Sequence, residues 1–226
     1  MFGNCIRLNK IKQKGEKMKT IIILATVMVL FITHSNSFSQ AGVKVGFEGG
    51  VNFANVRLNL YGAPTSESNV RTGIVAGAFL QFKLVDNLYL HTGIGYIQKG
   101  TSSVNDISKI IQKTDYFEIP ISLILKFPTE IVTPFFSAGA QYGFRLSAKQ
   151  SQKYFSGEEY NVDVKKYYNA TDLEFLFGGG LEHNLGKHFD IYVNFLYGFG
   201  TANVFKSIQL GTVRNRGMQL TTGVKF

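Results

Sequence analysis

Two groups of residues in this sequence have types and spacing that could support metal binding or catalysis. In the first, His183 and His188 flank a short turn beside Glu182 and Asp190. Imidazole nitrogens and carboxylate oxygens are ordinary zinc ligands, but spacing across a turn is a weak signal for such a site. An ordinary polar turn is the favoured interpretation, and we predict no metal site.

The second group could form a hydrolase triad. His91 is followed in the sequence by Ser102, Ser103 and Asp106. A triad is recognised by the mutual geometry of its side chains, which spacing alone does not supply. We interpret His91 as an interior hydrogen-bonding residue and predict no catalytic residue.

Two glycine-containing stretches resemble nucleotide-binding motifs and fail them. "GIGYIQKG", residues 93–100, has its third glycine misplaced for a dinucleotide fingerprint and lies in an expected strand. "GLEHNLGK", residues 180–187, has five residues between its glycines where a phosphate-binding loop has four. The sequence therefore predicts neither a cofactor nor an enzymatic activity.

The charged side chains occupy one face of alternating segments, as "DYFEIPISLILKF" illustrates at 115–127. Every second residue is apolar: Phe117, Ile119, Ile121, Leu123, Leu125 and Phe127. The other face contains Tyr116, Glu118, Pro120, Ser122, Ile124 and Lys126. Alternation over this length predicts a strand with two unlike faces.

Eight such segments follow residue 40, and none has the period of a helix. They cover about 43–56, 71–84, 87–99, 114–127, 135–148, 171–184, 189–201 and 216–226. Their length is that of a tilted strand that crosses a bilayer. Short connections alternate with long ones, which we place at 57–70, 100–113, 149–170 and 202–215. This layout predicts an all-β fold, an eight-stranded antiparallel up-and-down transmembrane β-barrel with both termini on the short-turn side.

The composition of the two faces indicates which one points inward. The apolar face carries no charge along any segment, whereas the opposite face is rich in glycine and contains scattered charges of both signs. Glycine weakens an exposed strand but suits a narrow lumen that side chains must share. We therefore place the apolar face against lipid, in preference to a soluble barrel with that face inside.

Charges inside the barrel need partners. The expected lumen network consists of Glu48, Lys83, Glu118, Lys126, Arg145 and Glu174. Lys83, Lys99, Lys126 and Arg145 are the candidate partners of Glu118, and Arg145 is preferred because its guanidinium can bind a carboxylate through two hydrogen bonds. Pro120 lacks a backbone donor, so we expect a local bulge or an interior water there, unless the strand starts after it.

The N-terminal part has the layout of a secretory signal. Basic residues surround Met18, an apolar run covers 21–32, and small residues follow up to Ser39. We predict an upstream extension over 1–17, a signal peptide over 18–39 that is cleaved after Ser39, and a barrel domain over 40–226.

Removing the signal also changes the charge balance. The whole chain has a formal charge of +9, but residues 40–226 contain 18 basic and 14 acidic residues, a net charge of +4. No basic run with interleaved aromatics is present, so a nucleic-acid partner is not expected. The one cysteine, Cys5, precedes the signal, and the barrel domain has no thiol chemistry.

Several of these stretches resemble one family. "GVKVGFEGGVNFANV", the Tyr96–Gly100 stretch "YIQKG", the Tyr116–Pro120 stretch "YFEIP" and "PFFSAGAQYGFRL" are similar to the PorT-like outer-membrane beta-barrel family of Bacteroidota. The resemblance covers about residues 42–226. It implies an outer-membrane barrel and, for the namesake members, a part in type IX protein secretion. The family has no catalytic residue to transfer.

The function expected from these observations is a non-enzymatic outer-membrane barrel with a filled lumen and a structural or interaction role. A narrow small-solute channel and a lipid-modifying outer-membrane enzyme remain alternatives. The expected partners are outer-membrane lipid, the barrel assembly machinery and a secretion-system protein, and the barrel itself should be a monomer. The loops should be extracellular and the termini periplasmic. The terminal aromatic, Phe226, is expected to act as an assembly signal, and the basic and aromatic stretch 149–170 should contact headgroups or a ligand.

Overall fold

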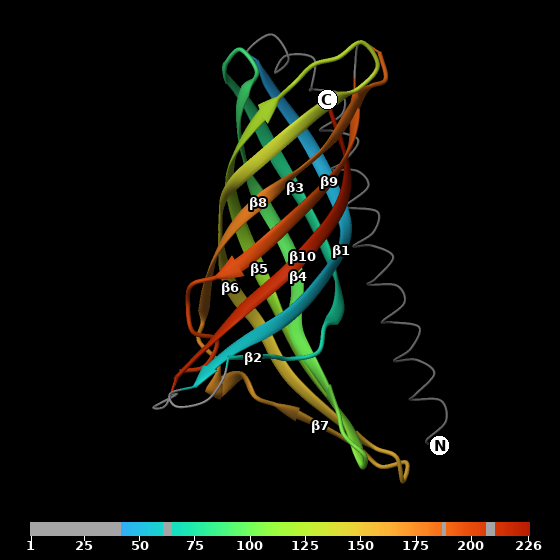
Figure 1. Cartoon of the computed structure of the whole chain (residues 1–226), viewed down its shortest axis with the longest axis vertical. Helices are drawn as coiled ribbons and strands as arrows, with labels where there is room; N and C mark the ends of the chain where they lie inside the picture. Colours follow the sequence, from blue (N-terminus) through green and yellow to red (C-terminus); the bar gives the residue numbers. More distant parts are fainter. Residues whose placement is uncertain (1–41, 61–64, 187–188, 207–210) are drawn as a thin grey trace, which may run out of the picture.

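The computed structural model describes residues 42–60, 65–186, 189–206 and 211–226, and within them the chain forms one closed β-barrel (Figure 1). Its eight long strands are β1 (Val43–Leu60), β3 (Arg71–Val85), β4 (Leu88–Val104), β5 (Ser108–Lys126), β6 (Thr133–Tyr154), β8 (Thr171–Asn184), β9 (Asp190–Gly200) and β10 (Gly211–Lys225). Two short strands, β2 (Ser66–Glu67) and β7 (Glu159–Asp163), and a 3-10 turn at Lys165–Tyr167 complete the elements.

Each long strand pairs antiparallel with its neighbours in the chain, and β10 pairs with β1 to close the ring. Closure satisfies the backbone hydrogen bonds of every wall strand, which a sheet in lipid requires. The expected eight-stranded up-and-down barrel is thereby confirmed. The turn between β3 and β4 is tight, and Asn87 takes the left-handed conformation (φ 66°) that asparagine tolerates.

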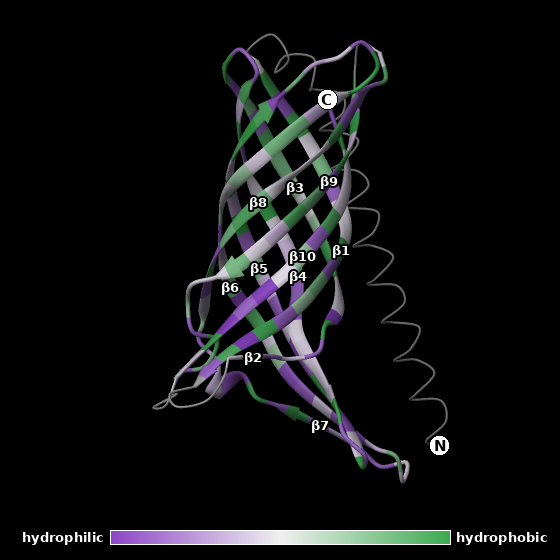
Figure 2. Ribbon diagram, in the orientation of Figure 1, coloured by the Kyte–Doolittle hydropathy of each residue, from purple (hydrophilic) through white to green (hydrophobic). Residues whose placement is uncertain are grey.

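The two faces lie as the alternation predicts. On β5, Ile121 and Leu123 are about half exposed (56% and 48%), whereas Glu118 and Ser122, at the alternate positions of the same strand, are buried (4% and 6%). Figure 2 shows the same alternation of hydrophobic and hydrophilic residues along the tilted wall strands. The apolar side chains thus point outward and the polar ones point into the lumen.

The strands on the long-loop side extend further than the sequence analysis predicts. The expected loop 100–113 is largely strand and the expected loop 149–170 is half strand, because β4, β5 and β6 continue past the rim and β7 adds to β6. We call this four-stranded sheet the extension; it comprises residues 101–104, 108–113, 149–154 and 159–163. It projects beyond the other strands at the lower end of Figure 1. The strands of the extension have no apolar face, so the sequence pattern does not distinguish them from loop. The predicted strands therefore end before the observed ones do.

Pro120 neither shifts the register nor starts the strand. β5 pairs with β4 at Ile121 and again at Glu118 in one register, with the intervening pairs missing. The absent N–H therefore interrupts the ladder locally, and the predicted bulge at this residue is wrong. The irregularity of the β5–β6 ladder falls instead between Asp115 and Tyr116.

The upstream extension 1–17 and the signal peptide 18–39 lie outside the described residues, so both stay predictions.

Phe226 closes the β10 edge against β1. Its backbone N–H donates to the Val45 carbonyl and its carbonyl accepts from the Val45 N–H, at 2.8 and 3.2 Å. Its ring lies 6.4 Å from that of Phe189, centroid to centroid.

Deleting Phe226 should lower the folded fraction in the membrane, because the closing strand loses its last pair and its terminal aromatic. Heat-dependent gel mobility measures this fraction; Phe226→Tyr is the control, and unchanged insertion of the deletion would remove the assembly role.

Candidate functional site in the barrel interior

The centre of the interior network is the ammonium group of Lys99 on β4. It lies 2.5 Å from a carboxylate oxygen of Glu118 on β5, and 3.1 and 3.0 Å from those of Asp172 and Glu174 on β8. All four side chains are almost completely buried. One cation therefore holds three carboxylates in the same part of the lumen.

Neutral side chains complete this Lys99 cluster. The Gln141 amide of β6 donates to Glu174 at 2.7 Å, and the Asn215 amide of β10 donates to Asp172 at 2.7 Å. Lys99 also lies over the ring of Tyr116, 5.1 Å from its centroid. Five wall strands meet in this cluster, so it crosslinks opposite sides of the barrel.

A second cluster lies nearer the short turns and has Glu182 of β8 at its centre. Its carboxylate pairs with Lys126 of β5 at 2.8 Å and with Lys225 of β10. Lys225 also donates to the side-chain oxygen of Gln81 on β3, at 3.0 Å. Here two cations share one anion, which reverses the balance of the Lys99 cluster.

Between the two clusters the lumen is mostly filled by aromatic and aliphatic side chains. Phe79, Ile124, Phe135 and Tyr192 pack together there, and the Tyr192 hydroxyl donates to Glu48 at 2.7 Å. The remaining interior cavity is about 60 Å³. Ligand pockets for small molecules usually measure roughly 300–1,000 Å³, so this space suits a few waters rather than a solute.

Loop residues close the long-loop mouth of the barrel. Tyr168 and Val204 are buried against Val56, Ala148 and Val213 of the wall, and we call these five residues the mouth cluster. The Tyr168 hydroxyl donates to the Gln112 side chain at 2.9 Å. Burial raises the pKa of this phenol to about 12, so it stays neutral and able to donate at physiological pH.

Arg145 stabilises this closure instead of joining the lumen network. Its guanidinium donates to the carbonyls of Lys165 and Tyr168, at 2.6 and 2.9 Å. Outside the closure lies a hollow of about 500 Å³, whose lining includes Lys166, Tyr167 and Lys206. Part of the basic and aromatic character expected of the stretch 149–170 thus lies at this hollow, in its last residues, together with Lys206 of the loop before β10.

Four of the six residues expected in the lumen network lie inside the barrel with polar partners: Glu48, Glu118, Lys126 and Glu174. The predictions that Lys83 and Arg145 belong to the lumen network were wrong. Lys83 pairs with Asp86 in the β3–β4 turn at 2.8 Å, and its side chain is 46% exposed. Glu118 pairs with Lys99 and not with the preferred Arg145, because Arg145 turns toward the loop carbonyls.

Asp172, Glu182 and Lys225 also belong to the network, although they are not among the six residues expected there. Glu182 and Lys225 lie at inward positions of the predicted strands, so the alternation could have included them. Asp172 also lies at an inward position of the predicted segment 171–184, two residues before Glu174, so the alternation could have included it as well. Asn215 precedes the predicted start of the last strand, so its inward position had no signal.

The histidine-containing groups form no site among the described residues. The Nδ1 atom of His183 lies 2.7 Å from the Ile131 carbonyl, Asp190 pairs with Lys44, and His188 lies outside the described residues. No group of His, Cys, Asp and Glu in the described part of the chain could hold a metal ion.

His91 stacks on Phe79, with ring centroids 4.5 Å apart. Its candidate triad partner Ser103 lies on the same strand, roughly 40 Å away at 3.3 Å per residue. Ser102, which bonds to the Val70 carbonyl, is separated from His91 by almost the same distance. His91 and these two serines therefore do not form a triad, and His91 lies in the interior as expected.

No helix among the described residues is long and apolar enough to cross a membrane.

Comparisons with known proteins place the chain among barrel sequences. The family described as "Outer membrane protein beta-barrel domain" matches residues 35–203. A similar solved structure is Neisserial surface protein A, with 14% identity, a TM-score of 0.44, and coverage of 82% of this chain and 97% of that one. OprG from Pseudomonas aeruginosa has 12% identity and a TM-score of 0.44, over 82% and 96% of the two chains. Ail, the attachment invasion locus protein of Yersinia pestis, has 16% identity and a TM-score of 0.38, over 81% and 99%. A comparison with curated proteins finds no match.

Proposed function

This chain belongs to the outer membrane protein beta-barrel domain family, and we propose that it is a non-enzymatic interaction barrel whose long-loop end binds a partner protein. The resemblance to PorT-like barrels of Bacteroidota supports a role as an accessory of protein secretion. The barrel is a monomer in this proposal, held in outer-membrane lipid after insertion by the assembly machinery.

The observation that carries the proposal is the form of the extension. Among the described strands β7 pairs only with β6, and all five of its residues are exposed. Its outer edge therefore presents unpaired backbone donors and acceptors, which can accept a further strand from another polypeptide. Val162 and Tyr160, each 54% exposed, supply apolar contacts beside that edge.

Site-specific crosslinking tests this proposal. A photoreactive amino acid at Val162 should capture a discrete protein partner in native membranes, and the same group at Glu130 in the opposite, short-turn end should not. Mass spectrometry of the product identifies the partner and shows whether it belongs to a secretion system. Equal products at both positions, or none at Val162, would count against the extension as a docking element.

The proposed orientation places the extension outside the cell and both termini of the chain in the periplasm. Protease added to intact cells should then cut within 149–170, because Glu158, Glu159 and their neighbours are exposed. Cleavage that requires a permeabilised outer membrane would reverse the orientation. The short turn at 128–132 serves as the internal control and should be cut only after permeabilisation.

A narrow channel is the alternative that the interior makes less favourable. Both ion-pair clusters and the aromatic layer lie across the path of a solute, and the mouth is closed by loop residues. The purified barrel should therefore give no steady conductance in planar bilayers. Discrete single-channel steps from the wild-type protein would support the channel.

The other alternative is a lipid-modifying enzyme. A change in the lipid composition of the membrane on expression of the protein would support it.

A further inference from the structure

Two arginines occupy directly opposed positions on the outward face where β1 meets β10. Arg57 pairs with Arg214 in the antiparallel register. Their neighbours Val56, Val213 and Asn215 are buried, so the arginines lie on the side that faces away from the lumen. Cβ atoms opposed in this way lie about 4.5–5.5 Å apart, and like charges at that distance repel each other.

Nearby carboxylates do not neutralise this pair. Glu67 of β2 is opposed to Arg57 in the β1–β2 register, but its carboxylate pairs with Arg216 at 3.1 Å and accepts from the Asn55 amide at 3.3 Å. Within the described ranges, no carboxylate lies within ion-pair distance of Arg57 or Arg214. The sequences at 61–64 and 207–210, "YGAP" and "SIQL", contain no acid either. The surplus of positive charge is therefore a property of this part of the chain.

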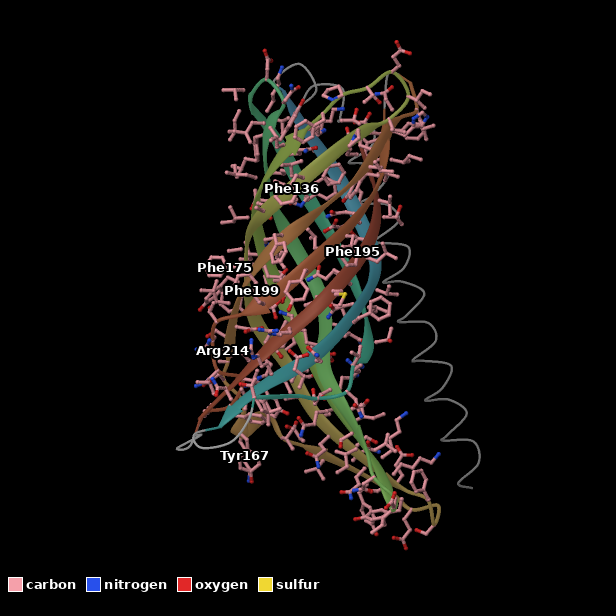
Figure 3. All side chains as sticks on the ribbon, viewed as in Figure 1. Phe136, Tyr167, Phe175, Phe195, Phe199 and Arg214 are labelled. Carbon is pink, nitrogen blue, oxygen red and sulfur yellow. The ribbon has the colours of Figure 1, made fainter. Side chains whose placement is uncertain are left out.

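Along the barrel, the arginine pair lies just past the exposed apolar residues, where the headgroup layer of a membrane is expected. Going toward the long loops, the outward residues of β10 are Leu220, Met218, Arg216 and Arg214. Leu220 and Met218 are exposed apolar side chains, and Arg214 follows Met218 by about 13 Å along the strand at 3.3 Å per residue. Figure 3 shows Arg214 on the long-loop side of Phe199 and the other labelled phenylalanines.

We propose that Arg57 and Arg214 together bind the phosphate of a lipid headgroup at the long-loop rim. A guanidinium presents a planar fork of donors that matches phosphate oxygens, and an anion between two such forks removes their mutual repulsion. We assign the phosphate to a lipid because acyl chains can lie along the exposed Met218 and Leu220, on the short-turn side of the site. A free phosphate gains no such contact.

The extension offers a matched comparison. Lys109 is opposed to Lys153 in the β5–β6 register, as Arg57 is to Arg214. There too an acid lies beside the pair, because Glu159 of β7 faces Lys153 on its other side as Glu67 of β2 faces Arg57. The lysine pair differs in its position beyond the apolar wall, so it lacks the adjacent lipid.

The test measures lipid retention by the full-length purified barrel in nanodiscs of phosphatidylcholine with a small fraction of phosphatidic acid. Native mass spectrometry counts the phosphatidic acid that stays bound. Arg57→Gln with Arg214→Gln should reduce retention about tenfold, since two charge-assisted contacts to phosphate are lost. Lys109→Gln with Lys153→Gln removes the same charge and should leave retention unchanged.

Further variants and a competitor separate the outcomes. Arg57→Lys with Arg214→Lys keeps the charge, loses the fork, and should retain an intermediate amount; it also carries the test if the glutamine variant fails to fold. Unchanged retention in the glutamine variant, or an equal loss in the lysine control, would overturn the site. Displacement of the lipid by inorganic phosphate at comparable concentration would mean that the site binds free phosphate and is not specific for a lipid headgroup.

Discussion

Replacing Lys99 by alanine is expected to lower the free energy of unfolding of the barrel by about 3–5 kcal/mol, the usual cost of leaving buried charges without their partner. Three carboxylates depend on this one ammonium group, at 2.5, 3.1 and 3.0 Å. The measurement is denaturant unfolding of the purified barrel in detergent micelles. Lys83→Ala is the matched control, because that lysine pairs only in an exposed turn, and its removal should change the midpoint little.

A double-mutant cycle assigns the effect to the cluster. Glu118→Ala combined with Lys99→Ala should cost less than the sum of the two single changes, since the second change removes a charge that the first left unpaired. Glu118→Ala combined with Arg145→Ala should be additive, because Arg145 binds loop carbonyls. Coupling to Arg145 and additivity with Lys99 would contradict the described network.

Gly178→Val should have the second large effect, a loss of folded barrel in the membrane. A Cβ atom at Gly178 would lie 2.0 Å from the backbone oxygen of Phe195 on β9, which cannot move without displacing that strand. Overpacking of this kind typically costs about 1–3 kcal/mol, and a backbone clash is at the upper end. The folded fraction after insertion, read from heat-dependent gel mobility, measures the effect.

Gly95 provides the control for this substitution. It also points into the lumen, but a Cβ atom there would meet nothing closer than 3.4 Å, the backbone oxygen of Ala76. Gly95→Ala should therefore fold nearly as well as the wild type, and Gly178→Ala should not. Equal tolerance at the two positions would mean that the lumen has more space than the structure gives it.

The strand count, the order of the strands and the direction of each face could be predicted from the sequence, because a period of two distinguishes the inward from the outward residues. The pairing inside the lumen could not. Which inward residues meet depends on their height in the barrel, and that height depends on the tilt and stagger of the strands. Lys99 and Glu174 lie on opposite walls and meet because of this stagger, which alternation does not report.

Local irregularities account for the two misplaced residues. The register of β5 and β6 shifts beside Arg145, and the guanidinium reaches the carbonyls of Lys165 and Tyr168 instead of the lumen. Lys83 lies beside a second register shift, at the end of β3, where its side chain finds Asp86 in the turn. No glycine or proline lies at either register shift, so the sequence does not mark these two irregularities.

The central claim is that the apolar face of each strand meets lipid and that the polar face fills the lumen, and spin labels on β5 test it most directly. The barrel domain contains no cysteine, so single cysteines at Ile121, Ser122, Leu123 and Ile124 can be labelled cleanly. In lipid bilayers, labels at Ile121 and Leu123 should be relaxed strongly by dissolved oxygen, which concentrates among acyl chains. Labels at Ser122 and Ile124 should be shielded from it. The reverse pattern, with oxygen reaching Ser122 and not Leu123, would contradict the inward polar face and the account built on it.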